Sequence, residues 1–296
     1  MASVSLAWGS SYLLMKIGLD SISPFNLIAL RFGIAFICMA VLFFQRFRTL
    51  TVSILLKGSL IGILLFLLFG GLVCGVNHTT ASTAGFLAST TVIIVPILES
   101  ILKRKLPNKS IMLSILLAVT GLYLLTIKDS LSLDNGSVYC LLAALFYAIY
   151  IVVLDRIAKN EDTLLISIIQ LGVTALLGAL LMLCVETPSL PETPIQWSAI
   201  ICLGLICSAY GFVVQPIVQR YTSPERIGLI FSLEPVFSAI LSYIFLHEVL
   251  AVKGYIGAAF IFAGVVLSKI TIPATTSHAH HASSPIVQDT QVQVRP

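Results

Sequence analysis

Glu234 is an ionisable residue within a long apolar stretch of the sequence, between residues 224 and 246. If this stretch is a helix, Glu234 lies ten residues from its nearer end, which is roughly 15 Å at 1.5 Å per residue. A carboxylate at such depth is costly to bury and is a candidate for function. Two roles are open: Glu234 binds a cationic group of a ligand, or it holds a structural hydrogen bond beside Pro235, which lacks a backbone donor.

Two aromatic pairs share helix faces in other apolar stretches. Trp8 and Tyr12 are spaced i,i+4, and Tyr147 and Tyr150 are spaced i,i+3, so each pair lies on one side of a helix. Such pairs could line a pocket for an apolar or ring-bearing solute. The alternative is aromatic packing between helices, and the sequence leaves both open.

Further polar side chains lie within or at the ends of apolar stretches and are candidates for solute contacts. A pocket usually needs a few convergent polar groups, and the candidates are Asn77, His78, Ser89, Tyr210, Gln215 and Gln219. The predicted substrate-binding residues are therefore Trp8, Tyr12, Asn77, His78, Ser89, Tyr147, Tyr150, Tyr210, Gln215 and Glu234.

Arg31 and Glu99 are charged residues in the same kind of surroundings. Arg31 lies about six residues into its stretch, where a long side chain can still reach the polar edge. It is predicted to be structural, with substrate contact or pairing to an internal carboxylate as alternatives. Glu99 is predicted to form a structural i,i+4 ion pair with Lys103.

The cysteines and histidines indicate neither a metal site nor a disulfide framework. The cysteines lie in apolar stretches without a CxxC motif and are predicted to be buried thiols: Cys38, Cys74, Cys140, Cys184, Cys202 and Cys207. The only histidine cluster, at residues 278–281, could bind a metal, but this signal is weak because the cluster lies in a polar segment that is predicted to be a disordered tail. No cofactor is expected.

The composition favours a membrane protein. Hydrophobic residues make up 58% of the 296 residues, charged residues 10%, and the mean hydropathy is +1.03, which leaves too little polar surface to face water. In lipid, only helices or a closed barrel satisfy the backbone. The apolar stretches do not alternate in polarity and are about 20 residues long, which predicts helices.

Apolar runs and polar breaks predict ten membrane-spanning helices. Turn residues such as Ser23-Pro24 and Ser223-Pro224 mark several breaks. The first run lacks a basic start, so it is predicted to be a span and not a cleaved signal peptide. The ten predicted helices cover residues 3–19, 25–45, 54–76, 80–102, 110–127, 136–155, 163–184, 195–219, 224–246 and 252–270.

The distribution of Lys and Arg predicts how the chain crosses the membrane. Basic residues of short loops stay on the cytoplasmic side. With the N-terminus inside, cytoplasmic segments hold thirteen of the 17 basic residues, and the external ends hold only Lys16, Lys128 and Lys253. Both termini are therefore predicted to lie on the cytoplasmic side of the cytoplasmic membrane.

An internal repeat appears when the sequence is shifted by 143 residues. The shift aligns Thr79, Gly85 and Ser89 with Thr222, Gly228 and Ser232; apolar matches include Phe69 with Phe212, and Gly121 matches Gly264. Shifts of 138 and 139 pair Tyr12 with Tyr150 and Arg31 with Gln170. These matches predict repeats at residues 1–128 and 129–270 and a tail at 271–296. A repeat of five helices is odd-numbered, so the second copy must be inverted, as in secondary transporters.

Several short motifs carry a resemblance to a known family, and they occur in its order over residues 1 to 270. The chain resembles the EamA-type branch of the drug/metabolite transporter superfamily through Trp8-Gly9-Ser10-Ser11 with Lys16, Leu30-Arg31-Phe32, Leu233-Glu234-Pro235, His247-Glu248, and Gly257 to Gly264. The first repeat departs from the family in having Lys105 where members often have a glutamate, which this chain keeps only at Glu248.

The resemblance implies an all-α membrane fold of two inverted five-helix repeats. It also implies a central cavity lined by the first, third, fourth, sixth, eighth and ninth helices. Members of the family export amino acids or related metabolites, or carry sugars and drugs. The expected partners are thus a small-molecule substrate and the lipid bilayer, and nothing indicates nucleic acid.

The predicted function is secondary transport of a small organic metabolite, such as an amino acid, in the export direction. No P-loop motif is present for direct use of ATP. The alternative is a membrane-embedded enzyme or a lipid-handling protein without transport activity, although the histidines and carboxylates do not cluster as an enzyme would need. Proton coupling through Glu234, facilitated transport, and the oligomeric state stay open.

Overall fold

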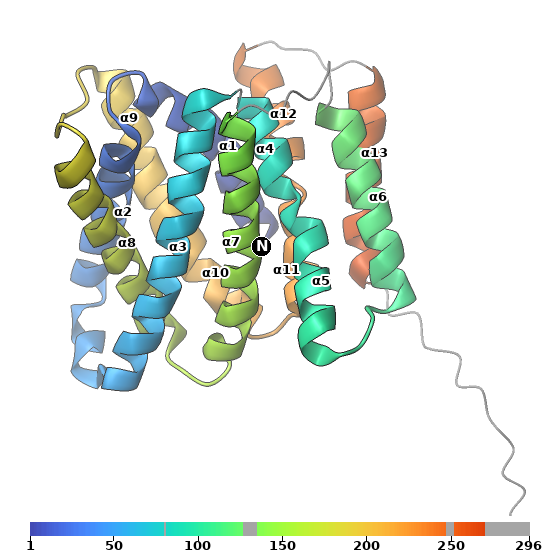
Figure 1. The fold of residues 1–296 in the computed structure, drawn as a ribbon, viewed down its shortest axis with the longest axis horizontal. Helices are drawn as coiled ribbons and strands as arrows, with labels where there is room; N and C mark the ends of the chain where they lie inside the picture. Colours follow the sequence, from blue (N-terminus) through green and yellow to red (C-terminus); the bar gives the residue numbers. More distant parts are fainter. Residues whose placement is uncertain (80, 127–134, 247–251, 270–296) are drawn as a thin grey trace, which may run out of the picture.

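The described part of the chain is a bundle of helices (Figure 1). A computed structural model describes residues 1–79, 81–126, 135–246 and 252–269, and these residues contain no strand. The elements are α1 (Ala2–Leu19), α2 (Pro24–Leu42), the 3-10 helix η1 (Phe44–Thr49), α3 (Val52–His78), α4 (Ala81–Ser89), α5 (Thr91–Lys103), α6 (Lys109–Thr126), α7 (Asn135–Ala158), α8 (Thr163–Val185), α9 (Pro194–Cys202), the π-helix η2 (Leu203–Tyr210), α10 (Gly211–Gln219), α11 (Pro224–Phe231), α12 (Glu234–Leu246) and α13 (Val252–Lys269).

Helix starts follow the turn and capping residues of the sequence. Pro24 and Pro224 begin α2 and α11, as the predicted breaks require, because a proline in the first turn has no N–H that needs a partner. Asp162 caps α8 by accepting from the N–H groups of Leu164 and Leu165. Thr193 forms a capping box at the start of α9.

Three predicted continuous helices are interrupted, which corrects the sequence prediction. The stretch 80–102 divides into α4 and α5, 224–246 into α11 and α12, and 195–219 contains η2 between α9 and α10. Hydroxyl groups bond to backbone carbonyls at two of these breaks: Thr90 Oγ1 lies 2.6 Å from Leu87 O, and Ser232 Oγ lies 2.6 Å from Leu229 O. Such bonds compete with the regular helix ladder and bend it.

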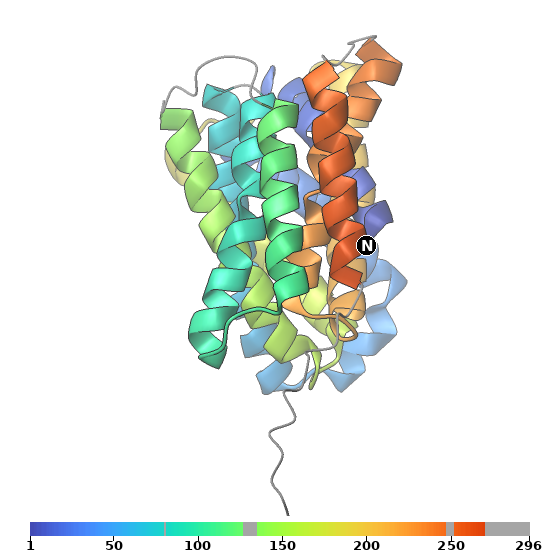
Figure 2. The same ribbon diagram turned by 90° about the vertical axis from the view of Figure 1, so that its right-hand side faces the viewer.

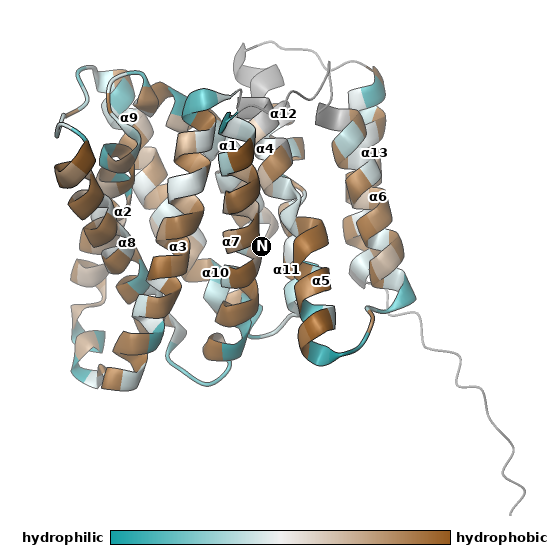
Figure 3. Ribbon diagram, in the orientation of Figure 1, coloured by the Kyte–Doolittle hydropathy of each residue, from teal (hydrophilic) through white to brown (hydrophobic). Residues whose placement is uncertain are grey.

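The outer surface is apolar, as expected of a multi-pass membrane protein. Within the described residues, five helical segments are long and apolar enough to cross a membrane: α2, α3, α7, α8 and Pro194–Gln219. Large side chains such as Leu56, Leu116 and Phe262 are more than half exposed. Figure 3 shows hydrophobic residues along the helices and hydrophilic ones gathered at the helix ends. This pattern suits a lipid surround and confirms the prediction of membrane helices.

Small residues bring helices into close contact. Figure 2 shows α6 and α13 side by side on one flank of the bundle. A Cβ added at Gly121 of α6 would lie 2.5 Å from Gly257 O of α13, and one at Gly264 would lie 2.8 Å from Ser114 O. Glycine is therefore needed where these two backbones approach, as is typical of helix contacts in lipid.

Candidate functional site

A cavity lies in the middle of the bundle, between helices that are far apart in the sequence. Its volume is about 40 Å³, room for a few water molecules but not for an organic metabolite. Its lining is mostly aromatic and aliphatic, with several hydroxyl groups and one carboxylate among the described residues: Trp8, Ser11, Tyr12, Leu68, Phe69, Leu72, Ala88, Ser89, Thr91, Tyr147, Phe212, Gly228, Phe231, Ser232 and Glu234.

Trp8 is the centre of an aromatic cluster on one wall of the cavity. Its ring centroid lies 4.8 Å from that of Phe212, 4.9 Å from that of Phe231 and 6.1 Å from that of Tyr147. The indole Nε1 donates to Cys207 O at 2.7 Å. A Cβ on Gly211 would lie 2.5 Å from that nitrogen, so the glycine is what allows the indole to reach the backbone. These contacts hold Trp8 in one orientation.

Glu234 supplies the carboxylate of the cavity. It is the first residue of α12, directly after the break that separates α12 from α11, and it is buried. Tyr12 Oη lies 3.5 Å from Glu234 Oε2, at the limit of a hydrogen bond. No basic side chain pairs with Glu234 among the residues that the structure describes. The carboxylate thus has capacity to accept hydrogen bonds from a ligand.

Two of the three helix breaks lie at the cavity: the break between α4 and α5, and the break between α11 and α12. Ser89 and Thr91 flank the break between α4 and α5, and Ser232 lies in the break between α11 and α12. Their hydroxyl groups donate to the backbone: Ser89 to Gly85 O at 2.7 Å, and Thr91 to Ala88 O at 2.7 Å. Each oxygen keeps acceptor capacity that can face a solute.

Half of the predicted binding residues come together at this cavity. Trp8, Tyr12, Ser89, Tyr147 and Glu234 all line it, although they belong to α1, α4, α7 and α12. The remaining predicted residues do not line the cavity, and the structure shows where each of them lies instead.

Tyr150 lies behind the cavity wall. It is fully buried, its ring stands edge-on to Phe212 at 6.2 Å, and its hydroxyl donates to Gln170 Oε1 at 2.9 Å. Its polar atom is therefore engaged between α7 and α8. Tyr150 packs helices together and supports the wall from outside.

Asn77 and His78 are at the exposed end of α3, away from the cavity. His78 Nδ1 lies 2.9 Å from Cys74 O of its own helix, and both residues are exposed or half-buried. The sequence placed them in the last turn of an apolar helix, and such a turn emerges at the membrane surface.

Tyr210, Gln215 and Gln219 do not share one face. Tyr210 is 42% exposed and its hydroxyl lies 2.7 Å from Ser3 Oγ, whereas both glutamines are fully buried and lie 3.5 Å apart, Gln215 Nε2 to Gln219 Oε1. The π-helix η2 ends at Tyr210, and α10 continues to Gln219. Five positions separate Tyr210 from Gln215, which is about 140° around an α-helix, whereas Gln215 and Gln219 are spaced i,i+4 on one side. None of the three lines the cavity.

The aromatic residues Phe69, Phe212 and Phe231 were missed as cavity residues, as were Ser232 and Thr91. A signal existed for some of them, since Phe69 with Phe212 and Ser89 with Ser232 are matches of the 143-residue repeat. If one member of a matched pair faces the cavity, the other is expected to face it as well. Phe231 gave no comparable signal.

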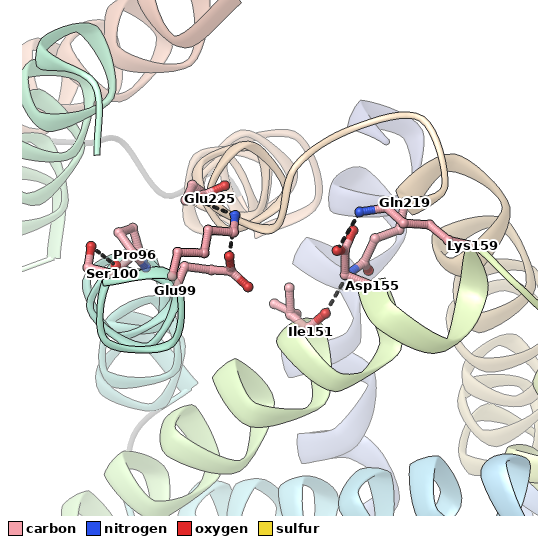
Figure 4. A network of polar contacts seen from close by, with 9 residues as sticks. Pro96, Glu99, Ser100, Ile151, Asp155, Lys159, Gln219 and Glu225 are labelled. Carbon is pink, nitrogen blue, oxygen red and sulfur yellow. Dashed lines mark hydrogen bonds and ion pairs between the residues drawn. The ribbon is translucent and has the colours of Figure 1, made fainter. Parts of the chain in front are cut away.

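A polar network ties helices together near the end of the bundle where α5 and α7 end (Figure 4). Lys103 pairs with Glu99 one turn earlier in α5, which confirms the predicted ion pair, and also with Glu225 of α11, at 3.3 Å. Asp155 of α7 and Lys159, the residue directly after this helix, form a second pair at 2.7 Å. Lys103 therefore links α5 to α11 across a region remote in sequence.

Metal-ligating groups do not cluster in the described segments. No set of three or more His, Cys, Asp or Glu side chains there is arranged to hold a metal ion, and all six cysteines are free thiols. His247, Glu248, and the tail histidines His278, His280 and His281 lie outside the described residues.

Comparisons with known proteins agree with the geometry. The model of the EamA-like transporter family matches residues 1–127 and again residues 134–270. An uncharacterized transporter of Archaeoglobus fulgidus is 30% identical over 275 residues, which cover 92% of this chain and 85% of the relative. The uncharacterized transporter YetK of Bacillus subtilis is 27% identical over 288 residues, or 91% and 86% of the two chains.

A solved crystal structure shares the fold. It superposes with a TM-score of 0.76 at 20% sequence identity, and the match covers 90% of this chain and 93% of the other. A multi-pass helical fold, a cavity between its helices and a family match over both halves all point the same way: this chain belongs to the EamA-like transporter family.

Proposed function

We propose that this protein is a secondary transporter that exports a small organic metabolite, such as an amino acid, by alternating access. The observation that carries the proposal is the buried cavity with Glu234 in an aromatic wall, at the junction of two broken helices. Broken helices around a midplane site are the usual construction of secondary transporters. The direction of transport rests on the family resemblance.

The proposed architecture is ten spans in two inverted repeats. Joining the interrupted helices gives ten spans, and the helix limits repeat with the sequence shift of 143: α5 begins at Thr91 and α12 at Glu234, while α6 begins at Lys109 and α13 at Val252. Packing is paired in the same way, because α1 lies against α12 as α7 lies against α5. These regularities support a two-fold relation between the halves.

The small cavity volume supports a mechanism in which the bundle must open to admit a solute. At about 40 Å³, the cavity corresponds to a closed conformation, since it holds only a few waters. The broken helices provide places where segments can move relative to one another. The Lys103 ion pairs then hold one end shut until they separate.

The chemistry of the wall favours a solute that carries an ammonium group and an apolar or ring-bearing part. A carboxylate attracts a cation strongly where water is scarce. Aromatic faces such as those of Trp8 and Tyr147 add attraction for a cation and for apolar surface. Glu234 also offers a site for proton coupling, and a facilitator that moves no protons is the alternative.

Transport by purified protein in proteoliposomes tests this function. We expect uptake of labelled L-phenylalanine by the parent protein. The uptake rate should fall by about tenfold or more in Glu234→Gln, because the ammonium group of the solute loses the carboxylate that pairs with it. Glu192→Gln, which changes an exposed residue, is the matched control. Full activity of Glu234→Gln would remove Glu234 from the site, and proton flux measured with uptake separates coupling from facilitation.

A further inference from the structure

Arg31 is a fully buried cation whose charge the described part of the chain leaves unpaired. Its side chain has no exposure to solvent. Nε donates to Ser208 Oγ at 2.9 Å, while Nη1 and Nη2 have no hydrogen-bond partner there. No carboxylate forms an ion pair with it among the described residues. An arginine is always protonated, so an unpaired positive charge is buried at this point.

The guanidinium lies directly behind the cavity wall. Its Cζ is 4.5 Å from the centroid of the Phe69 ring and 5.1 Å from that of Phe32. Phe69 is a cavity residue, so the charge lies against a ring that belongs to the cavity wall. Movement of the Phe69 ring would bring the guanidinium into contact with the cavity. The rings attract the cation, but such contacts offset only part of the cost of burying it.

The partner of Arg31 lies on an unusual helix. Ser208 belongs to η2, the π-helix between α9 and α10. π-helical turns are rare and often occur at functional sites. The next residue toward the N-terminus, Cys207, accepts the hydrogen bond of Trp8 from the cavity wall. Arg31 is thus connected to the cavity through Phe69 and through the segment Cys207-Ser208.

The second repeat shows what a purely structural residue looks like at the equivalent place. Arg31 corresponds to Gln170 at a shift of 139. Gln170 is fully buried as well, but it accepts from Tyr150 at 2.9 Å and donates to Phe212 O at 3.0 Å. A neutral amide satisfies its surroundings there. Packing alone therefore does not call for a charge at Arg31.

We infer that Arg31 and Ser208 form a subsite for the carboxylate of the transported solute and that this subsite determines specificity. The inference rests on the proposed transport function. In the open cavity, Phe69 turns aside, Nη1 and Nη2 donate to the carboxylate oxygens, and the ammonium group of the same solute meets Glu234. The carboxylate of the transported solute therefore supplies the negative charge that pairs with Arg31.

Binding of a simple carboxylate tests the subsite without any transport. In a Trp197→Phe protein, Trp8 is the one remaining tryptophan and reports on its neighbour Cys207. We expect benzoate to change its fluorescence saturably in detergent, and Arg31→Gln to abolish the change. Arg31→Lys keeps the charge without the bidentate geometry and should bind more weakly. Arg46→Gln, at a largely exposed arginine, is the control and should respond as the parent protein does.

Discrimination between solutes tests specificity in proteoliposomes. L-phenylalanine and phenethylamine share a ring and an ammonium group, and only the first has a carboxylate. We expect Arg31→Gln to reduce the preference for L-phenylalanine by about 30-fold or more. The carboxylate of L-phenylalanine would then be buried without the guanidinium that pairs with it. Phenethylamine uptake should change little.

The two experiments separate the possible failures. If neither solute is transported by the parent protein, the proposed function fails for this class of solute, and the benzoate titration still decides the role of Arg31. If Arg31→Gln folds and keeps both the benzoate response and the preference for L-phenylalanine, Arg31 does not bind the carboxylate and the inference is wrong. If Arg31→Gln does not fold, Arg31→Lys decides: unchanged affinity and preference would overturn the inference.

Discussion

Tyr147 and Tyr150 show how differently two residues of one helix face can be used. Tyr150 donates its hydroxyl to Gln170 and has a defined structural partner. The hydroxyl of Tyr147 is buried, has no hydrogen-bond partner within the described residues, and belongs to a side chain that lines the cavity. A buried polar group without a partner costs stability. Under the proposed function, this hydroxyl is available to form a hydrogen bond with a bound solute.

Substituting each tyrosine with phenylalanine separates these roles. Tyr150→Phe leaves Gln170 Oε1 without its donor and should destabilise the protein by about 1 kcal/mol. Tyr147→Phe removes an unpaired hydroxyl and should leave stability unchanged or raise it. Thermal unfolding in detergent measures both, and solute affinity should fall in Tyr147→Phe. Equal loss of stability in the two variants would contradict this assignment.

At the scale of the elements, the interrupted helices provide the two features that a transporter needs. The breaks at Thr90 and at Ser232-Leu233 bring hydroxyl groups and Glu234 to the cavity. On one side of the two breaks, α5 and α11 run from the cavity to the ion-pairing residues Lys103 and Glu225. Motion at the breaks can therefore be coupled to the ion pairs at one end.

Glu225→Gln should loosen the link between α5 and α11. The Lys103 side chain of this pair is half exposed, so the pair should contribute no more than about 1 kcal/mol. Its loss should therefore change the ratio of open to closed molecules at this end of the bundle by no more than about fivefold. Spin labels at Leu106 and Tyr221, both 82% exposed, measure the separation of these ends in a protein without native cysteines.

The control for this experiment is Lys159→Gln, which removes a cation whose ion pair, among the described residues, is with Asp155 four positions earlier. This substitution should leave the distribution of distances between the spin labels at Leu106 and Tyr221 unchanged. If Glu225→Gln does the same, the link from Lys103 to Glu225 does not hold this end closed.

The contact of α6 with α13 depends on glycine. A methyl group at Gly121 would meet backbone atoms of Gly257 and Ile261 at 2.5 and 2.8 Å, so Gly121→Ala should separate the helices and cost about 1–3 kcal/mol. Gly33→Ala is the matched control, because nothing lies within 4 Å of its added Cβ. Alanine there should be neutral or slightly stabilising. A thermal unfolding series compares the two, and similar unfolding temperatures would show that the helices adapt.

At the scale of the whole molecule, charges gather at the end of the bundle that the sequence assigns to the cytoplasm. Lys57 pairs with Glu161, and the hydrogen bond from its ammonium lowers the pKa of the Glu161 carboxyl. Arg46 pairs with Asp162 at 3.8 Å. These pairs join the start of α3 and the 3-10 helix η1 to the loop before α8. The orientation in the membrane stays a prediction from the basic residues.

Sided labelling tests that orientation. Asn160 and Leu190 are both exposed and lie in the loops at the two ends of α8. In intact cells that express a protein without native cysteines, a membrane-impermeant maleimide should label Leu190→Cys and should reach Asn160→Cys only after permeabilisation. The reverse pattern would place both termini outside.

Much of this protein was determined by its sequence alone. Long apolar runs, turn residues and glycine-rich stretches are local features, and they correctly predicted membrane helices, many of their limits and the family. Glu234 was identified because a charge in an apolar run is conspicuous. The ion pair of Glu99 with Lys103 followed from spacing within one helix.

The tertiary structure decided which residues meet. In lipid, the outer face of a helix is as apolar as its packed face, so the sequence pattern does not show which side of α3 or α10 points inward. The convergence of Phe69, Phe212 and Phe231 with Trp8 on one cavity, and the exposure of Tyr210 at the end of the π-helix, depend on contacts between distant segments. The absence of a partner for most of the Arg31 guanidinium, within the described segments, is likewise visible only when all neighbouring helices are in place.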